Sequence, residues 1–151
     1  MNEYQPLPQP DDILLVEDNQ TDQELELRAL NKCNPFLKIT LVQDGQEALD
    51  YLRCEGAYSD RNPQNPRIVL LDLKLPKISG IEVLRHIRAF PKTRLIPVVI
   101  LTSSNQEKDL VETYRLGVNS YIVKPLDFAD FQKVVNELGI YWTRHNQTPN
   151  L

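Results

Sequence analysis

Short apolar runs that end abruptly in a polar residue are the feature that most limits the fold of this chain. The runs and the residues that follow them are Ile13–Val16 with Glu17 and Asp18, Ile68–Leu71 with Asp72, Val98–Leu101 with Thr102, and Tyr121–Val123 with Lys124. Apolar runs of this length are typical of strands that are buried on both faces of a parallel sheet. Parallel strands share one carboxyl edge, so we expect the polar residues to gather there.

Stretches with helical spacing of apolar residues alternate with these strands, and a further strand is predicted at Ile39–Val42. Helices are expected from about 20 to 31, from Asp44 to 52, from Ser79 to before Pro91, from Ser104 to Gly117, and after Asp127. Five strands in strict alternation with five helices predict a parallel sheet with helices on both faces. We expect an α/β, doubly wound (βα)5 fold with the common strand order 2-1-3-4-5.

The chain length of 151 residues fits one domain, which we place at residues 12–140. Residues 1–11 are polar and rich in proline and are expected to form a flexible arm. Residues 54–67 are expected to form an extended surface loop, and residues 141–151 a C-terminal extension.

The composition argues against several classes of protein. The net charge of −4 speaks against a nucleic-acid-binding surface, which usually carries a basic patch. No apolar run is long enough to cross a membrane, and the N-terminus lacks the pattern of a signal peptide. Cys33 and Cys54 make no disulfide framework. A cytoplasmic protein with reduced thiols is expected.

The polar residues at the sheet edge predict a cation and phosphoryl site. Clustered carboxylates repel one another unless a cation lies among them, and Mg²⁺ is the ion that carboxylate and phosphate oxygens bind together. Asp72 ends its strand alone and is the candidate nucleophile, whereas the adjacent Glu17 and Asp18 suit metal binding. Lys124 and Thr102 could neutralise phosphoryl oxygens. Each residue alone has an ordinary explanation as a cap, turn or strand residue, so the prediction depends on their joint occurrence.

Four motifs fit one known family. They are Ile-Leu-Leu-Val-Glu-Asp-Asn at 13–19, Asp-Leu-Lys-Leu-Pro-Lys-Ile-Ser-Gly at 72–80, Leu-Thr-Ser at 101–103 and Tyr-Ile-Val-Lys-Pro at 121–125. With their spacing, they resemble the receiver domain of two-component response regulators over roughly residues 12–138. The resemblance implies a flavodoxin-like receiver fold and a signalling switch rather than an enzyme.

The resemblance also implies a metal and phosphorylation site. Asp72 would accept a phosphoryl group from a histidine of a sensor kinase. Mg²⁺ would be held by Glu17, Asp18, Asp72 and the backbone carbonyl of Lys74. The family often has a neutral or acidic side chain at the position of Lys74, and a cation there is expected to slow hydrolysis of the acyl phosphate.

A switch next to the phosphoacceptor is implied in the same way. Thr102 would turn toward the phosphoryl group, Tyr121 would swing inward, and Lys124 would pair with phosphoryl oxygens. The Lys124–Pro125 peptide bond is expected to be cis, as in the family.

Two further features bear on partners. The long segment between Asp18 and Asp72 resembles the standalone regulators of bacterial phytochrome kinases, so the kinase partner is expected to be of that kind. An apolar stripe on the last helix predicts a homodimer, unless Gly139 ends that helix and its far end folds back over the monomer. The stripe consists of Phe128, Phe131, Val135, Leu138 and Trp142.

Other functions are open at this point. The chain could be a phosphotransfer intermediate in a multistep relay, or a pseudo-receiver that binds partners without phosphorylation. A flavin carrier would need a phosphate-binding loop rich in Ser, Thr and Gly where Glu-Asp-Asn-Gln occupies 17–20, and an aspartyl phosphatase would need a second Asp at position 74.

Overall fold

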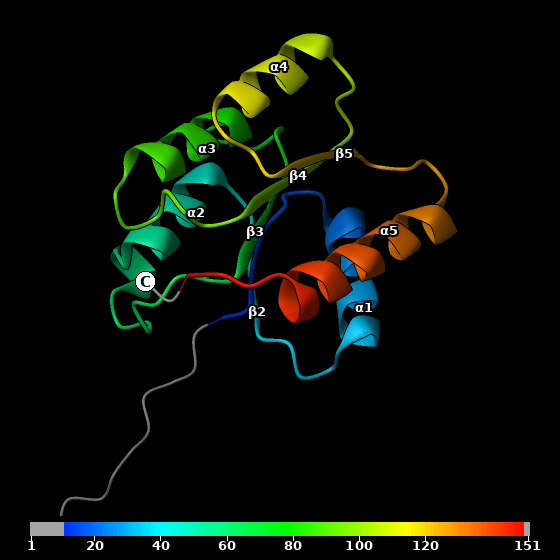
Figure 1. Ribbon diagram of the computed structural model, residues 1–151, viewed down its shortest axis with the longest axis horizontal. Helices are drawn as coiled ribbons and strands as arrows, with labels where there is room; N and C mark the ends of the chain where they lie inside the picture. The colour runs from blue at the N-terminus through cyan, green and yellow to red at the C-terminus, as the bar shows by residue number, and fades with distance from the viewer. Residues whose placement is uncertain (1–10, 150–151) are drawn as a thin grey trace, which may run out of the picture.

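The computed structural model describes residues 11–149. The strands are β1 Ile13–Val16, β2 Ile39–Val42, β3 Ile68–Leu71, β4 Val98–Thr102 and β5 Ser120–Val123. The helices are α1 Gln20–Cys33, α2 Gly45–Arg53, α3 Gly80–Ala89, α4 Glu107–Arg115 and α5 Phe128–Ile140. All strands are parallel in the order β2-β1-β3-β4-β5, so the predicted fold and strand order are confirmed (Figure 1).

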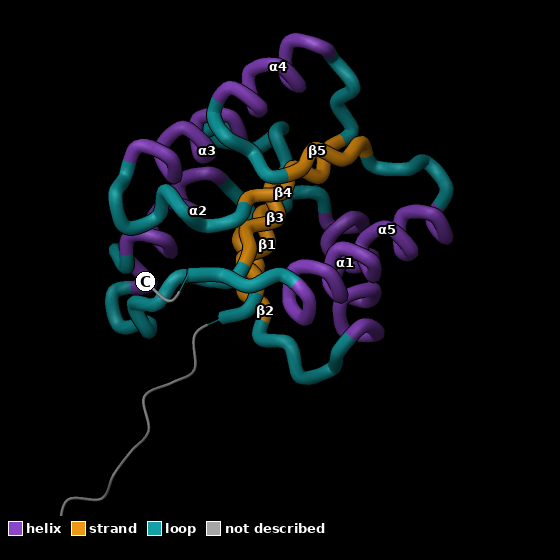
Figure 2. The backbone as a smooth tube through the Cα atoms, viewed as in Figure 1, coloured by secondary structure: helices purple, strands orange, loops and turns teal. Residues whose placement is uncertain are grey.

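Helices cover both faces of the sheet, α1 and α5 on one face and α2, α3 and α4 on the other (Figure 2). Successive residues of a strand point to opposite faces. Leu14 and Val16 of β1 therefore belong to the core beneath α2 and α3, whereas Ile13 and Leu15 belong to the core beneath α1 and α5. β1, β3 and β4 are buried throughout, as their continuous apolar runs predict.

β5 is less buried than its apolar sequence suggests. It pairs only with β4 and forms one edge of the sheet, and Val123 is exposed. An edge strand is covered on fewer sides than a central one, so the expectation of burial on both faces is wrong for β5.

The starts of three helices follow the capping residues expected from the sequence. The side chains of Asp44, Ser79 and Asp127 each accept a hydrogen bond from the backbone N–H three residues later, at the starts of α2, α3 and α5. These bonds satisfy N–H groups that have no partner within the helix.

α4 begins differently from the prediction. Ser104 does not cap it, because its buried hydroxyl donates to the carboxylate of Asp109 at 2.6 Å, and the helix starts only at Glu107 without a side-chain cap. The residues between β4 and α4 therefore form a loop that is tied to the first turn of α4 by a side chain.

The segment 54–67 is folded around the guanidinium group of Arg61. This group donates to the backbone carbonyls of Tyr51 at 2.5 Å and Gln64 at 3.0 Å, and it lies 4.1 Å from the centre of the Tyr51 ring. The segment also contains a short 3-10 helix, Gly56–Tyr58, in which the Tyr58 hydroxyl donates to Glu47 at 2.7 Å.

The chain continues as a helix beyond α5, through a π-helical turn at Tyr141–His145. Gly139 does not end α5. A side chain at that position would lie 2.9 Å from Leu30 of α1 and 3.2 Å from the sulfur of Cys33, so glycine permits close packing of α5 on α1. Beyond the turn, the chain crosses in front of the amino-terminal edge of the sheet (Figure 1). Arg67 donates to the backbone carbonyl of Thr143 at 2.5 Å, which ties the π-helical turn to the end of loop 54–67. The crossing segment, residues 146–149, leads on from this turn.

Most of the predicted interface stripe on α5 is buried within the protomer. Phe131, Val135 and Leu138 pack into the core beneath α1 and α5, so they cannot contact a second copy of the chain. Their expected role as interface residues is wrong, because the whole inward face of α5 is needed to cover the sheet. Phe128 is exposed, and Trp142 is half-buried.

Candidate functional site

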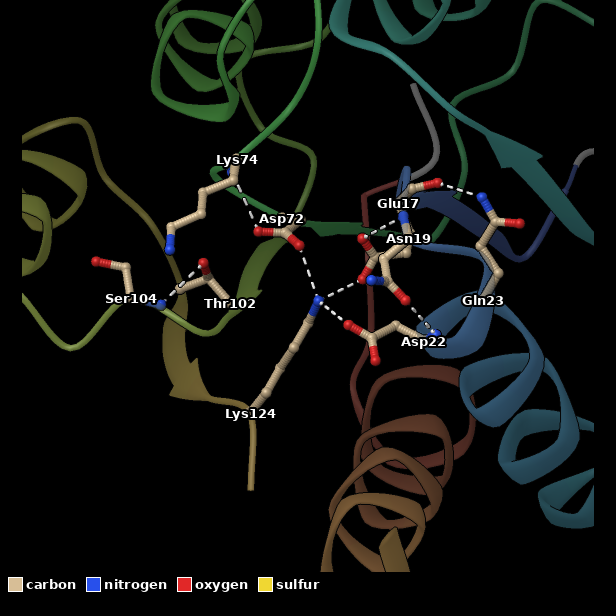
Figure 3. A network of polar contacts seen from close by, with 9 residues as sticks. All are labelled: Glu17, Asn19, Asp22, Gln23, Asp72, Lys74, Thr102, Ser104 and Lys124. Atoms are coloured by element: carbon tan, nitrogen blue, oxygen red, sulfur yellow. Dashed lines mark hydrogen bonds and ion pairs between the residues drawn. The ribbon is translucent and has the colours of Figure 1, made fainter. Parts of the chain in front are cut away.

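The carboxyl ends of the strands bring the predicted polar residues together (Figure 3). β1 and β3 are neighbours, so Glu17 and Asp72 follow the ends of adjacent strands. Thr102 is the last residue of β4, and its carbonyl accepts a hydrogen bond from the backbone N–H of Lys124 at 2.7 Å. Pairing between strands therefore places the carboxylates, the hydroxyl and the amine at one edge of the sheet.

The ammonium group of Lys124 lies at the centre of this site. Its Nζ is 2.8 Å from Oδ2 of Asp72 and 2.7 Å from Oδ2 of Asp22, and it also donates to Oε1 of Glu17. The side chain of Lys124 is only 9% exposed and that of Glu17 1%. Charges that are removed from water attract one another more strongly than charges on the surface, so this contact set holds the site in one arrangement.

Burial and Lys124 together set the protonation of the site. Burial raises the pKa of Asp72, but the hydrogen bond and positive charge of Lys124 outweigh it and hold that pKa below its usual value. Burial raises the pKa of Glu17 to about 7 against the opposing effect of Lys124, and the negative charge of Asp72 adds to the rise. Burial alone would lower the pKa of Lys124, yet hydrogen bonds to three carboxylates raise it. Asp72 is thus ionised and Lys124 charged at neutral pH.

Glu17, Asp18 and Asp72 fit a divalent cation. Each offers one carboxylate oxygen, and these oxygens lie within 4.8 Å of one another. Hard oxygen donors with several negative charges suit Mg²⁺ and Mn²⁺. Burial is the main cause of the raised pKa of Glu17, and the negative charge of Asp72 adds to it. A divalent cation bound here would favour the ionised form of both carboxylates. The role of the Lys74 carbonyl as a ligand stays a prediction.

The backbone around Asp72 is fixed by close packing. Oδ1 of Asp72 accepts a hydrogen bond from the backbone N–H of Lys74 at 3.1 Å. At Gly80, a side chain would lie 2.1 Å from the backbone oxygen of Asp72, so only glycine lets the start of α3 approach the loop that carries the carboxylate. The side chain of Lys74 is exposed and runs past Asp72 on the side of Thr102 (Figure 3).

Thr102 and Tyr121 both contact Ser104 in the loop between β4 and α4. The hydroxyl oxygen of the fully buried Thr102 accepts a hydrogen bond from the backbone N–H of Ser104 at 3.3 Å. The hydroxyl of Tyr121 donates to the backbone carbonyl of Ser104 at 2.8 Å. The two predicted switch residues are therefore linked through one loop residue, which strand-end reasoning did not single out.

Two acidic residues of α1 also face the site and were missed from the sequence. Asp22 contacts Lys124, and Glu26 is 1% exposed with its Oε2 atom lacking a hydrogen-bond partner among the described residues. Burial, together with the negative charge of Glu17, raises the pKa of Glu26 to about 9. Both lie one turn apart on a helix that starts at the same sheet edge, and that spacing was the available signal.

The expectation of a cis bond between Lys124 and Pro125 is wrong. Residues 11–149 contain no cis peptide bond. The trans form is the more stable isomer even before proline, and four residues from Lys124 to Asp127 suffice to lead from β5 to the start of α5 without a cis turn.

Comparison with known proteins agrees with this geometry. The family model described as "Response regulator receiver domain" matches residues 13–136, which is most of the chain. The chain belongs to the response regulator receiver family. This receiver carries the acidic cluster, the buried threonine and the lysine at the positions that its motifs predict.

Several relatives cover nearly the whole receiver. The probable methanogenesis regulatory protein FilR2 of Methanothrix harundinacea is 45% identical over 138 residues, which are 91% of this chain and 86% of FilR2. Response regulator Rcp1 of Synechocystis is 38% identical over 88% of this chain and 89% of Rcp1. The phosphorylated cyanobacterial phytochrome response regulator RcpA superposes with a TM-score of 0.86 at 38% identity, over 91% of this chain and 97% of RcpA. A Mn²⁺-bound form of Rcp1 superposes equally well, at 36% identity over 93% of this chain and 99% of that one. The receiver is thus related to phytochrome response regulators.

Proposed function

We propose that this receiver accepts a phosphoryl group on Asp72 from a phosphohistidine of a sensor kinase, in a reaction that depends on Mg²⁺. The observation that carries the proposal is the contact between the Lys124 ammonium and Asp72 beside the acidic cluster of Glu17, Asp18 and Asp72. These groups supply a nucleophile, a fixed positive charge and a place for a cation within one small region. The phosphorylated relative RcpA and the Mn²⁺-bound form of Rcp1 support the same chemistry.

The transfer step follows from the charges of the site. An ionised oxygen of Asp72 forms a bond to phosphorus while the bond from phosphorus to the histidine nitrogen breaks. The electron pair of that bond stays on the imidazole ring, and the product on this chain is an acyl phosphate. Glu17, Asp18, Asp72 and the Lys74 carbonyl would hold Mg²⁺, whose charge offsets that of the phosphoryl oxygens.

The acyl phosphate would then act as a switch. Lys124 can donate to a phosphoryl oxygen in place of a carboxylate. The Thr102 hydroxyl can turn away from the backbone N–H of Ser104 and donate a hydrogen bond to another phosphoryl oxygen. Tyr121 would follow into the space that Thr102 leaves, which moves the loop before α4 and changes the surface that partners contact.

The similarity to phytochrome response regulators supports a proposal for the kinase partner and the cellular compartment. The kinase would be a histidine kinase of the phytochrome type, acting in the cytoplasm. Residues 12–140 would be the receiver unit, with loop 54–67 and extension 141–151 as additions to it; residues 1–10 of the predicted arm lie outside the described residues. None of the described helices is long and apolar enough to cross a membrane.

The test is phosphorylation with acetyl phosphate and Mg²⁺, followed by intact mass. We expect the wild type to gain one phosphoryl group, Asp72→Asn to gain none, and Asp60→Asn, a change in the exposed part of loop 54–67, to behave as the wild type. EDTA should abolish the gain. Full labelling of Asp72→Asn would mean that another residue accepts the phosphoryl group, which would overturn the proposal. If the wild type took up no phosphoryl group, a passive binding module would be the better description. Phosphotransfer from candidate kinases of the same genome then identifies the partner.

A further inference from the structure

Asp22 of α1 is a third carboxylate on the ammonium group of Lys124. We propose that Asp22 is a positioning residue, which holds Lys124 in the unphosphorylated receiver and competes with the incoming phosphoryl group for it. The inference rests on the proposed function and adds to it a residue that none of the four strand-end motifs contains.

The hydrogen-bond donors of Lys124 are fully used. An ammonium group has three N–H donors, and Nζ contacts Asp22 at 2.7 Å, Asp72 at 2.8 Å, and Glu17. Lys124 can therefore donate to a phosphoryl oxygen only after it gives up one of these carboxylates. The length of the bond to Asp22 is close to that of the bond to Asp72, so Asp22 is a full partner of Lys124.

The backbone of Asp22 is fixed at this place. Its N–H donates to the side chain of Asn19, which caps α1, at 2.9 Å, and the backbone N–H of Asn19 is 3.4 Å from Oε2 of Glu17. The first turn of α1 and the end of β1 thus form one bonded unit. This arrangement directs the Asp22 carboxylate toward Lys124 (Figure 3).

Exposure indicates which carboxylate Lys124 gives up. The side chain of Asp22 is 28% exposed, whereas that of Glu17 is 1% exposed and that of Asp72 8% exposed. A buried carboxylate that loses its hydrogen-bond partner is left without water to replace it, which is costly in free energy. A partly exposed carboxylate can bind water in place of the lost partner. Release from Asp22 is therefore the least costly way to free a donor of Lys124.

A simpler role for Asp22 is the ordinary preference of helix starts for acidic residues. That role would affect the stability of α1 and leave phosphorylation unchanged. Glu24 provides the matched control, because it is an exposed acidic residue of the same helix and is not a partner of Lys124. Glu24→Gln removes the same charge from α1 without freeing a donor.

The experiment compares rates of phosphorylation by acetyl phosphate in saturating Mg²⁺, measured by intact mass. Asp72 forms its bond to phosphorus as the bond to the acetate oxygen breaks, and acetate leaves with the electron pair. We expect Asp22→Asn to react about three- to fivefold faster than the wild type, the size of effect of a partly exposed charge pair. Asp22→Glu, which restores the carboxylate, should return the rate toward that of the wild type, and Glu24→Gln should match the wild type.

Calorimetric titration with Mg²⁺ and thermal melting complete the test. We expect Asp22→Asn and Glu24→Gln to have similar Mg²⁺ affinities and melting temperatures. A rate for Asp22→Asn that equals that of Glu24→Gln, or falls below the wild type, would overturn the inference, as would a tenfold loss of Mg²⁺ affinity, which would make Asp22 part of the metal site. If the wild type is phosphorylated and Asp22→Asn is phosphorylated no faster, this inference alone is refuted and the proposed function stands. A wild type that takes up no phosphoryl group overturns the proposed function and this inference with it.

Discussion

Glu26 is a buried carboxyl group on the α1 side of the site, and its environment favours the neutral acid. Burial, with the nearby Glu17, raises its pKa from an ordinary 4.5 to about 9. Between those values the folded chain holds a proton that the unfolded chain has released, so the contribution of Glu26 to stability is full below its ordinary pKa and is lost as the pH rises toward 9. Glu17, with a pKa of about 7, acts in the same direction at lower pH.

We therefore expect the metal-free protein to lose about 2 kcal/mol of unfolding free energy between pH 7 and pH 9. Glu26→Gln has the same shape and no titrating proton, so its stability should stay nearly constant over this range. The measurement is urea unfolding in EDTA at both pH values. Equal losses in the wild type and in Glu26→Gln would show that Glu26 is not the group responsible.

Lys74 is the cation two residues after Asp72, and its side chain runs past that carboxylate on the side of Thr102 (Figure 3). Its side chain is exposed, and no hydrogen bond or ion pair holds it elsewhere among the described residues. A cation beside the acyl phosphate can pair with a phosphoryl oxygen and shield the phosphorus from water. This pairing would lengthen the life of the signal.

Lys74→Asn should accordingly release phosphate about two- to fivefold faster than the wild type, in keeping with the modest effect of one exposed charge. The readout is phosphate release after removal of the phosphodonor. Lys77→Asn is the control, because Lys77 lies in the same loop but pairs with Asp44 at 3.4 Å. Slower release from Lys74→Asn than from the wild type would contradict the expected role.

At the scale of elements, apolar periodicity and capping residues determined most of what was predicted correctly. Continuous apolar runs indicated β1, β3 and β4, and Asp44, Ser79 and Asp127 marked the starts of three helices, because both signals depend on neighbours in the sequence. The gathering of the strand-end residues was predictable for another reason: strict alternation of strands and helices predicts a parallel sheet, and parallel pairing brings the carboxyl ends of the strands together.

The errors arise where contacts with distant residues decide the structure. Ser104 bonds to Asp109 and so fails to cap α4, although its local sequence fits a capping box. The sequence left open whether Gly139 ends the last helix, and only its contact with Leu30 of α1 decides that it does not. Asp22 and Glu26 join the site because α1 begins at the sheet edge, which depends on where the helix packs and not on the strand-end pattern.

At the scale of the whole molecule, the additions to the receiver lie away from the phosphoacceptor. Loop 54–67 and the crossing segment after α5 meet at the amino-terminal edge of the sheet, and with residues 95–97 they line a shallow cavity of about 330 Å³. The acidic cluster lies at the opposite edge, because its residues directly follow the carboxyl ends of β1 and β3. The proposed switch would therefore change the surface around α4 and β5 without disturbing the crossing segment.

Exposed apolar side chains occur on α4, on the edge strand β5 and at the start of α5, and β5 lies between the two helices, which cover opposite faces of the sheet (Figure 1). They are Val111, Tyr114, Val123, Leu126 and Phe128. Leu126 is fully exposed and Phe128 is 65% exposed, although they are only two residues apart. Apolar groups that gather in this way mark interaction surfaces. We expect the homodimer to form here, at the surface that the switch would alter, rather than through the buried stripe of α5.

Phe128→Ser should weaken the dimer at least about tenfold, because an aromatic side chain buried at an interface contributes roughly 1.5–3 kcal/mol. Sedimentation velocity over a range of concentrations measures the change, with and without beryllofluoride and Mg²⁺. Phe36→Ser is the control, since Phe36 is 87% exposed in the connection between α1 and β2, away from α4 and β5. Phe131→Ala should instead lower the unfolding free energy by about 3–5 kcal/mol, because this side chain is part of the core. A wild type that stays monomeric in every condition, or equal effects of the Phe128 and Phe36 changes, would rule out this surface as the dimer interface.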